Sequence, residues 1–88
     1  IENRHIIINE KGLHARASAK LVETVERFNA NAIISKDDIS VSGDSIMGLL
    51  MLAASKGQEI NIITSGPEEK KLSQALTNLI SNRFEEDL

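Results

Sequence analysis

The chain has 88 residues, no cysteine, a net charge of −3 and two aromatic side chains. This length fits one small domain over residues 1–88. The absence of cysteine excludes a disulfide framework, a thiolate nucleophile and a cysteine-based metal site, and two histidines are too few for a structural zinc site. An acidic chain with few aromatic side chains is not typical of a nucleic-acid binder, and no apolar run approaches the roughly 20 residues that cross a bilayer. We therefore expect a cytoplasmic protein that binds neither nucleic acid nor membrane and needs no metal or organic cofactor.

Strands and helices alternate in the first half of the chain. A short run of β-branched residues predicts a strand near residues 4–8. Apolar residues at helical spacing then predict a helix over Ala15–Phe28. Next, Ile33-Ile34 and the alternating segment Ile39–Ser42 predict two strands, which a tight turn at Lys36–Asp38 joins into a hairpin.

The second half continues the alternation with a short apolar helix over Ile46–Ala53 and a strand over Ile60–Ile63. Pro67 is expected to open the last helix, which has the clearest apolar stripe of the chain. The stripe contains Leu72, Ala75, Leu76, Leu79 and Ile80. The resulting order β-α-β-β-α-β-α predicts an α+β fold with helices covering one face of a sheet. The pattern alone does not separate this arrangement from a ferredoxin-like one.

The segment Gly12–Ser18 is the strongest functional signal, because it places His14 and Arg16 where a helix is expected to begin. The first N–H groups of a helix have no partner within it, and the helix dipole leaves partial positive charge there. The N–H groups of Ala15, Arg16 and Ala17 therefore form a candidate phosphate-binding site. We expect His14 to carry a phosphoryl group on a ring nitrogen.

The chemistry of this site depends on the charge state of His14. The positive field at a helix start disfavours imidazolium, and the neutral ring is the nucleophilic form. Arg16 keeps its proton and can donate two N–H groups to phosphate oxygens. We also expect Lys11 and Lys20 to concentrate positive charge around the ring. The other histidine, His5, lies in an apolar strand and is expected to be structural or to face solvent.

Two separated motifs, Gly12-Leu13-His14-Ala15-Arg16 and Ser45-Ile46-Met47-Gly48-Leu49-Leu50, resemble those of the HPr family, the histidine-containing phosphocarriers of the bacterial phosphotransferase system. The resemblance implies an open-faced β-sandwich, with a four-stranded antiparallel sheet and three helices on one face. It also implies a phosphocarrier rather than an enzyme, in which His14 takes a phosphoryl group from enzyme I and passes it to an enzyme IIA protein. Ala17 departs from the family pattern, which has proline there. We expect a small consequence, because alanine is an excellent helix former in a first helical turn.

Ser45 fits the N-cap position of the short helix, where its hydroxyl would accept a hydrogen bond from a first-turn N–H. The HPr resemblance implies a second role, phosphorylation of Ser45 by HPr kinase/phosphorylase, which weakens transfer from enzyme I. The helix that follows is apolar nearly all round and too short to bury every side. We expect Ile46, Leu49 and Leu50 to lie mainly inward and Met47 and Met51 to face partners. Together with Lys20, the residues Met47, Leu50 and Met51 form the candidate partner-binding set.

Other functions remain open at this point. Gly43–Ile46 also resembles the Asp-Ser-Leu motif of acyl carrier proteins, although those are helical bundles and this chain has several β-branched runs. A regulatory binding module of HPr type without phosphoryl relay is a further alternative. The segment Leu49–Ala53 resembles carriers of the nitrogen-related branch, whereas Ser45 points to kinase control, so the branch stays undecided. We expect the chain to be a monomer.

Overall fold

The computed structural model describes residues 1–86 and has the expected element order. Its elements are β1 (Glu2–Ile6), α1 (Ala15–Glu26), β2 (Asn31–Lys36), β3 (Ile39–Ser42), α2 (Ile46–Leu52), β4 (Glu59–Ser65) and α3 (Glu69–Ser81), followed by a short C-terminal turn, Arg83–Glu85. This confirms the predicted α+β class and the order β-α-β-β-α-β-α. The sheet also rules out the helical bundle of an acyl carrier protein.

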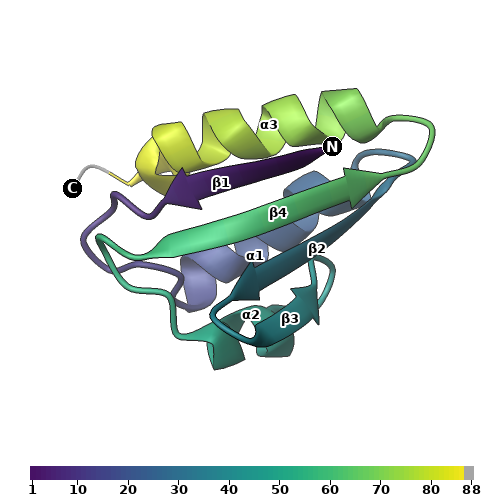
Figure 1. Ribbon diagram of the computed structural model, residues 1–88. Coiled ribbons are helices and arrows are strands. Elements are labelled where there is room, and N and C mark those ends of the chain that lie inside the picture. Colours follow the sequence, from purple (N-terminus) through teal and green to yellow (C-terminus); the bar gives the residue numbers. More distant parts are fainter. Residues whose placement is uncertain (87–88) are drawn as a thin grey trace.

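The four strands form one antiparallel sheet in the order β1-β4-β2-β3. The sheet faces the viewer in Figure 1, and the helices lie behind it. Side chains alternate along the central strand β4, where Ile60 and Ile62 are buried and Glu59 and Ile63 are exposed. One face of the sheet is therefore packed on helices and the other is open, as the resemblance to HPr proteins implied.

The core lies between the sheet and the helices, and all three helices contribute to it. It includes Leu21 and Val25 of α1, Leu49 and Leu52 of α2, Leu72, Leu76 and Ile80 of α3, Ile34, Ile60 and Ile62 of the sheet, and Phe84 of the C-terminal turn. The amphipathic stripes seen in the sequence account for the helical part of this core. Phe84 follows the apolar stripe of the last predicted helix, and no periodic pattern predicted its burial.

Several element boundaries differ from the prediction. Helix α1 ends at Glu26 rather than Phe28, α2 ends at Leu52 rather than Ala53, and β4 covers Glu59–Ser65 rather than Ile60–Ile63. The first strand is Glu2–Ile6 rather than residues 4–8, because its ladder ends where Ile6 pairs with Glu59, the first residue of β4. The last helix begins at Glu69 instead of Pro67, since the first backbone bond of this helix runs from the Leu72 N–H to the Glu68 carbonyl. Pro67 thus belongs to the turn that precedes α3.

Candidate phosphoryl-carrier site

His14 is the N-cap residue of α1, in extended backbone conformation and without a side-chain capping bond. The first backbone bond of the helix runs from the Ser18 N–H to the His14 carbonyl at 2.8 Å. The N–H groups of Ala15, Arg16 and Ala17 precede it and have no acceptor within the helix. Ala15 and Arg16 are exposed, but Ala17 is 0% exposed. Of the three residues expected to donate, two are therefore exposed and one is buried.

The loop before His14 is fixed against the end of α2. The Leu13 N–H donates to the Ala54 carbonyl at 2.9 Å. Gly12 has a φ of +64°, and a Cβ atom there would lie 2.4 Å from the Ala54 oxygen. Only glycine fits such a close approach at a positive φ. The position of His14 thus depends on a backbone contact with a segment about 40 residues away in the sequence.

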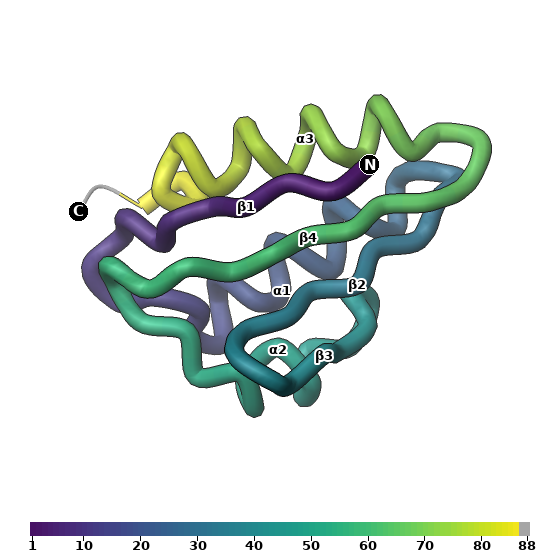
Figure 2. The backbone as a smooth tube through the Cα atoms, viewed as in Figure 1, coloured from purple at the N-terminus to yellow at the C-terminus, as the bar shows by residue number. Residues whose placement is uncertain are grey.

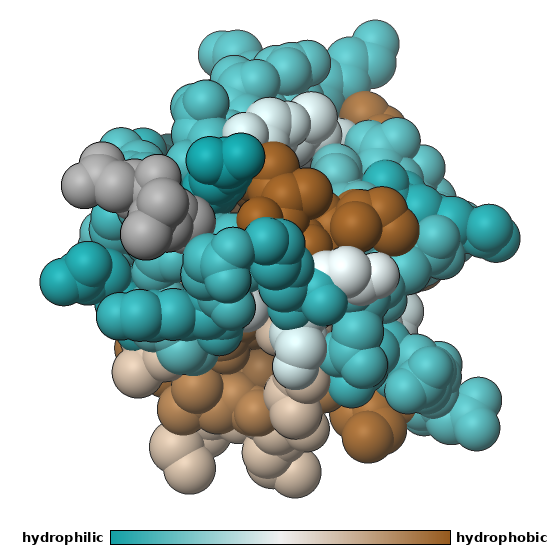
Figure 3. Space-filling view, turned by 90° about the vertical axis from the view of Figure 1, so that its left-hand side faces the viewer, coloured by the Kyte–Doolittle hydropathy of each residue, from teal (hydrophilic) through white to brown (hydrophobic). Residues whose placement is uncertain are grey.

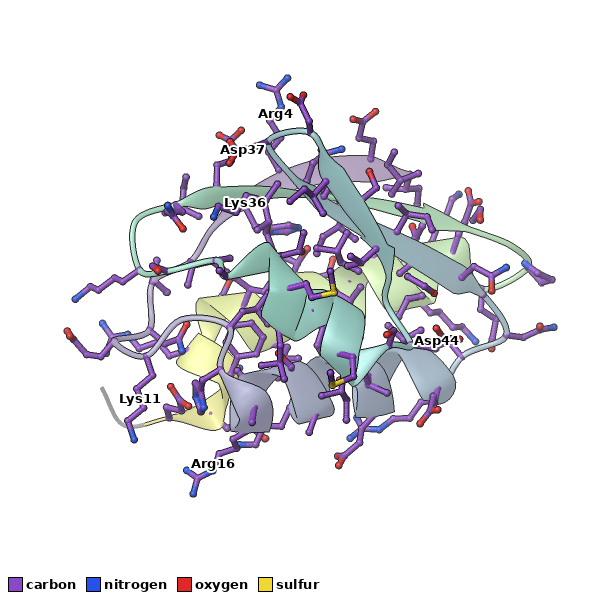
Figure 4. All side chains as sticks on the ribbon, turned by 90° about the horizontal axis from the view of Figure 1, so that it is seen from below. Arg4, Lys11, Arg16, Lys36, Asp37 and Asp44 are labelled. Atoms are coloured by element: carbon purple, nitrogen blue, oxygen red, sulfur yellow. The ribbon has the colours of Figure 1, made fainter. Side chains whose placement is uncertain are left out.

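Arg16 and Lys11 extend away from the fold at the same end of the molecule in Figure 4. Within residues 1–86, Arg16 takes part in no ion pair. Its guanidinium group can therefore turn toward an incoming oxyanion without breaking a contact of the resting protein. The positive side chains predicted for this region are present, but they are not the only charges there.

A carboxylate that the sequence did not predict lies against His14. An oxygen of Glu86 is hydrogen-bonded to His14 Nε2, and the other oxygen accepts from Asn9 Nδ2 at 2.9 Å. Asn9 is fully buried and also donates to the Gly12 carbonyl at 2.9 Å. The Glu86 side chain is 9% exposed and that of His14 is 27% exposed. The ring is therefore open to a partner on one side and held by an acid on the other.

The environment of Glu86 keeps its side chain ionised. Burial raises the pKa of this carboxyl, but the hydrogen bonds from Asn9 and His14, with the charges of His14 and Lys11, lower it by more. The net result is a pKa below the ordinary value. An anion that the sequence did not predict thus lies beside the positive side chains expected around His14.

The C-terminal turn brings Glu86 to this position. Arg83, Phe84 and Glu85 all have positive φ values, 57°, 54° and 64°. Non-glycine residues rarely adopt this region, so tertiary contacts must hold the turn. Phe84 is 0% exposed, and Lys20 donates from Nζ to the Phe84 carbonyl at 2.9 Å and lies 3.3 Å from the Glu85 carboxylate. Figure 2 shows this end of the chain beside the segment that follows β1.

These contacts give Lys20 a role that the sequence did not indicate. It was expected to bind partners, and in the structure its ammonium group secures the C-terminal turn. Sequence reasoning also missed Asn9, Phe84 and Glu86. Phe84 is one of only two aromatic residues and follows an amphipathic helix, which is the one signal that pointed to its burial.

Ser45 caps α2 as predicted. Its hydroxyl accepts a hydrogen bond from the Gly48 N–H at 3.0 Å. The neighbouring Asp44 carboxylate accepts from the Ser42 hydroxyl at 2.7 Å. In Figure 4, Asp44 and Arg16 lie far apart along the molecule. Ser45 therefore belongs to a site separate from that of His14.

The exposed face of α2 is apolar, and we call its side chains Ile46, Met47, Leu50 and Met51 the α2 patch. Met47 and Met51 are 72% and 70% exposed, as expected, while Leu49 is fully buried. Ile46 and Leu50 are 40% and 37% exposed, so the expectation that they lie mainly inward is wrong. The reason is that α2 has seven residues and packs along the edge strand β3. Figure 3 shows hydrophobic side chains gathered at the lower edge of the molecule.

The second histidine has no part in this site. His5 is half-buried in β1, and burial lowers the pKa of its imidazole.

In the part of the chain that the structure describes, no group of three or more His, Asp or Glu side chains could hold a metal ion. None of the helices over residues 1–86 has the length and hydropathy needed to span a bilayer.

A family model described as "PTS HPr component phosphorylation site" matches residues 1–82. The chain belongs to the HPr family. HPr from Xylella fastidiosa (strain 9a5c), a phosphocarrier protein, is 45% identical over 87 residues, which cover 99% of this chain and 98% of that protein. HPr proteins are phosphocarriers of the phosphotransferase system, and this chain is accordingly a carrier and not an enzyme in its own right. This role implies interaction with enzyme I and enzyme IIA proteins.

Solved HPr structures agree with the fold. The crystal structure of HPr-C-His from Thermoanaerobacter tengcongensis has a TM-score of 0.95 at 35% identity, and the match covers 100% of this chain and 99% of that one. The crystal structure of an HPr dimer from the same organism has a TM-score of 0.78 at 36% identity, with 93% and 95% covered. The sheet and the three helices of HPr are thus present in this chain.

Proposed function

We propose that His14 is the residue that carries the phosphoryl group, taking it from phosphorylated enzyme I and giving it to an enzyme IIA protein in the bacterial cytoplasm. The observation that carries this proposal is the place of His14 at the N-cap of α1, with a ring that is 27% exposed at the side-chain level. Transfer between two proteins needs a ring that a second active site can reach. A helix start supplies N–H donors for the oxyanion.

Arg16 is the second member of the site, and its role is electrostatic. Its exposed guanidinium can donate to phosphoryl oxygens and stabilise the charge that develops during transfer. The N–H groups of Ala15 and Arg16, two exposed residues, add to this. Because the same ring must both accept and release phosphate, these groups must not stabilise the phosphorylated state too strongly.

Labelling with enzyme I and phosphoenolpyruvate tests the assignment. The wild type is expected to form an acid-labile phosphoryl adduct, and His14→Ala is expected to form none. His5→Ala is the matched control, because it removes the other histidine and leaves the α1 start intact; it should label like the wild type. Equal labelling of His14→Ala and the wild type would show that the carrier residue lies elsewhere.

We further propose that phosphorylation of Ser45 by HPr kinase/phosphorylase weakens docking. A phosphate adds roughly −1.5 to −2 charge directly before the α2 patch. The helix start tolerates this charge, while an apolar partner surface does not. We expect Ser45→Asp to accept phosphate from enzyme I more slowly than Ser45→Asn, which has the same shape without the charge. Equal rates would remove the support for this regulation.

The oligomeric state is proposed to be monomeric, since a carrier that docks through a small patch needs that patch uncovered. A related HPr was crystallised as a dimer. Sedimentation equilibrium at micromolar concentration distinguishes the two states, and a dimer mass would overturn the proposal.

A further inference from the structure

A groove of about 310 Å³ lies between α1 and α3. Helix α1 packs against both α2 and α3 and lies between them (Figure 1). The groove is therefore on the other side of α1 from the α2 patch, and neither His14 nor Arg16 lines it. A molecule bound there leaves the proposed docking surface and the phosphoryl-carrier site uncovered.

The floor of this groove is apolar. Ala75 and Leu79 belong to the apolar stripe of α3, but both are only half-buried and line the groove. Alanine is the smallest residue of the stripe, so it leaves space between the helices that a leucine would fill. On the α1 side, the hydroxyl of Thr24 already donates to the Lys20 carbonyl at 2.9 Å and needs no partner from the groove.

Charged side chains of both signs form the rim of the groove. Lys20 Nζ lies 3.3 Å from the carboxylate of Glu85. Glu23 and Arg27 are exposed and take part in no ion pair within residues 1–86, although a glutamate four residues before an arginine is a favourable spacing for a helical pair. One carboxylate and one guanidinium group thus remain available, about 6 Å apart along the helix axis at a rise of about 1.5 Å per residue.

An amide of α3 adds a hydrogen-bond donor opposite these charges. The Oδ1 atom of Asn78 accepts from Gln74 Nε2 at 3.0 Å. The NH₂ group of Asn78, which also lines the groove, is therefore the part of this side chain that can donate to a ligand.

We propose that the groove between α1 and α3 binds a small α-amino acid in its zwitterionic form. The carboxylate of the ligand accepts from the Arg27 guanidinium and the Asn78 amide, and its ammonium group donates to the Glu23 carboxylate. An aliphatic side chain of the ligand covers Ala75 and Leu79. Such a combination of an apolar surface with a few polar groups is typical of small-molecule sites.

The balance of charges favours a zwitterion over other classes of ligand. The lining holds two cations, Lys20 and Arg27, and two carboxylates, Glu23 and Glu85, so its net charge is zero. A simple anion would be repelled by Glu23 and a simple cation by Arg27. An uncharged apolar molecule would take water from both charges and give them no partner. The volume lies at the lower end of the usual range of about 300–1,000 Å³, which suits one amino acid rather than a peptide.

The experiment is a titration of the full chain, followed by ¹H–¹⁵N NMR, with three probes that share one aliphatic tail. L-Leucine has both charges, 4-methylpentanoate lacks the ammonium group, and 3-methylbutylamine lacks the carboxylate. We expect L-leucine to shift the amide signals of α1 and α3 that border the groove, with saturation at millimolar concentration. Each single-charge probe should bind at least about 10-fold more weakly, because it loses one charge-assisted contact. No saturable shift with L-leucine, or equal affinity for a single-charge probe, would overturn the inference.

Two variants at exposed positions test the charge contacts separately. Arg27→Gln and Glu23→Gln should each weaken L-leucine binding by about 10-fold. Glu23→Gln should not weaken binding of 4-methylpentanoate, which has no ammonium group. Glu26→Gln is the matched control, because it removes an exposed carboxylate of the same helix that does not line the groove, and it should bind like the wild type. Wild-type affinity in Arg27→Gln, or an equal loss in Glu26→Gln, would show that the shifts arise elsewhere.

The inference is independent of the carrier role proposed for His14. His14→Ala should bind L-leucine with the affinity of the wild type, since the ring lies outside the groove. A loss of binding in this variant would contradict the placement of the ligand between α1 and α3.

Discussion

The starts of α1 and α2 differ in how their first N–H groups are satisfied, although each has a residue proposed to bear phosphate. Ser45 closes the start of α2 with its own hydroxyl, which accepts from the Gly48 N–H. His14 gives α1 no such bond and is held by segments distant in sequence, through Ala54 and Glu86. A helix start that serves a ligand leaves its donors open and relies on tertiary contacts for its position. A helix start that is capped by the side chain of its own N-cap residue does not depend on such tertiary contacts.

The largest expected effect comes from Phe84→Ala, which removes the buried side chain that holds the C-terminal turn. We expect a loss of about 3–5 kcal/mol in the free energy of unfolding. The contact of Glu86 with His14 should be lost as well, because Phe84 is the buried residue of the turn Arg83–Glu85. Chemical denaturation measures the first effect and the ring ¹⁵N shifts of His14 measure the second.

Phe28→Ala serves as the control for this variant. Phe28 is the only other phenylalanine, is partly buried and follows the opposite end of α1. It should cost less stability and leave the His14 ring signals unchanged. Equal ring shifts in both variants would show that the C-terminal turn does not act locally on the α1 start.

Gly12→Ala should be the next largest effect. Its Cβ atom would meet the Ala54 oxygen at 2.4 Å and its φ is +64°, so backbone strain alone costs about 1–3 kcal/mol. Gly48→Ala provides the counterpart at the start of α2, where no positive φ adds backbone strain and the closest atom is the Val41 Cβ at 3.0 Å. A helical alanine gains about 0.5–1 kcal/mol over glycine, which offsets part of the cost of this contact. Thermal denaturation should show a clear drop in Tm for Gly12→Ala and a smaller drop for Gly48→Ala.

Ser45→Ala should cost about 1 kcal/mol, since it removes the cap of α2. The change is local to that helix, so phosphorylation of His14 by enzyme I should continue at a rate close to that of the wild type. Urea denaturation and labelling kinetics check the two parts. If Ser45→Ala stays folded but is no longer phosphorylated on His14, the starts of α1 and α2 are coupled despite their separation.

The smallest effect is expected from acid. The folded protein lowers the pKa of Glu86 below its ordinary value of 4.5, so the stabilisation from this carboxylate is fully present above that value. It is lost as the pH falls through the lowered pKa, because a protonated carboxyl loses an acceptor for Asn9 and His14. Amide shifts around His14 should change in this acidic range, and those around Ser45 should not. The same titration of Glu86→Gln should lack the change.

The sequence predicted what depends on local pattern. The stripes of α1 and α3, the hairpin of β2 and β3, and the Ser45 cap all follow from residues close together in the chain. The exposure of Ile46 and Leu50 was missed because it depends on where α2 rests on the sheet edge. The HPr motifs supplied the strand pairing, which periodicity alone leaves open.

The surroundings of His14 were less predictable, for a physical reason. Glu86 is 72 residues from His14 in sequence, and it reaches the ring through three consecutive residues with positive φ that favour no regular element. Phe84 stabilises this arrangement only once the core exists. Asn9 is similar, because a buried asparagine in a loop has no pattern that distinguishes it from an exposed one. Contacts that close the fold are not encoded in any single segment.

The bond from Leu13 to Ala54 has a consequence for how partners approach. It joins the loop that carries His14 to the segment that ends α2, so the position of each depends on the other. A protein that binds the methionines of the α2 patch is thereby also placed at a defined distance and angle from the imidazole of His14. Donor and acceptor proteins of unrelated architecture can then share one docking geometry, with alignment built into the carrier.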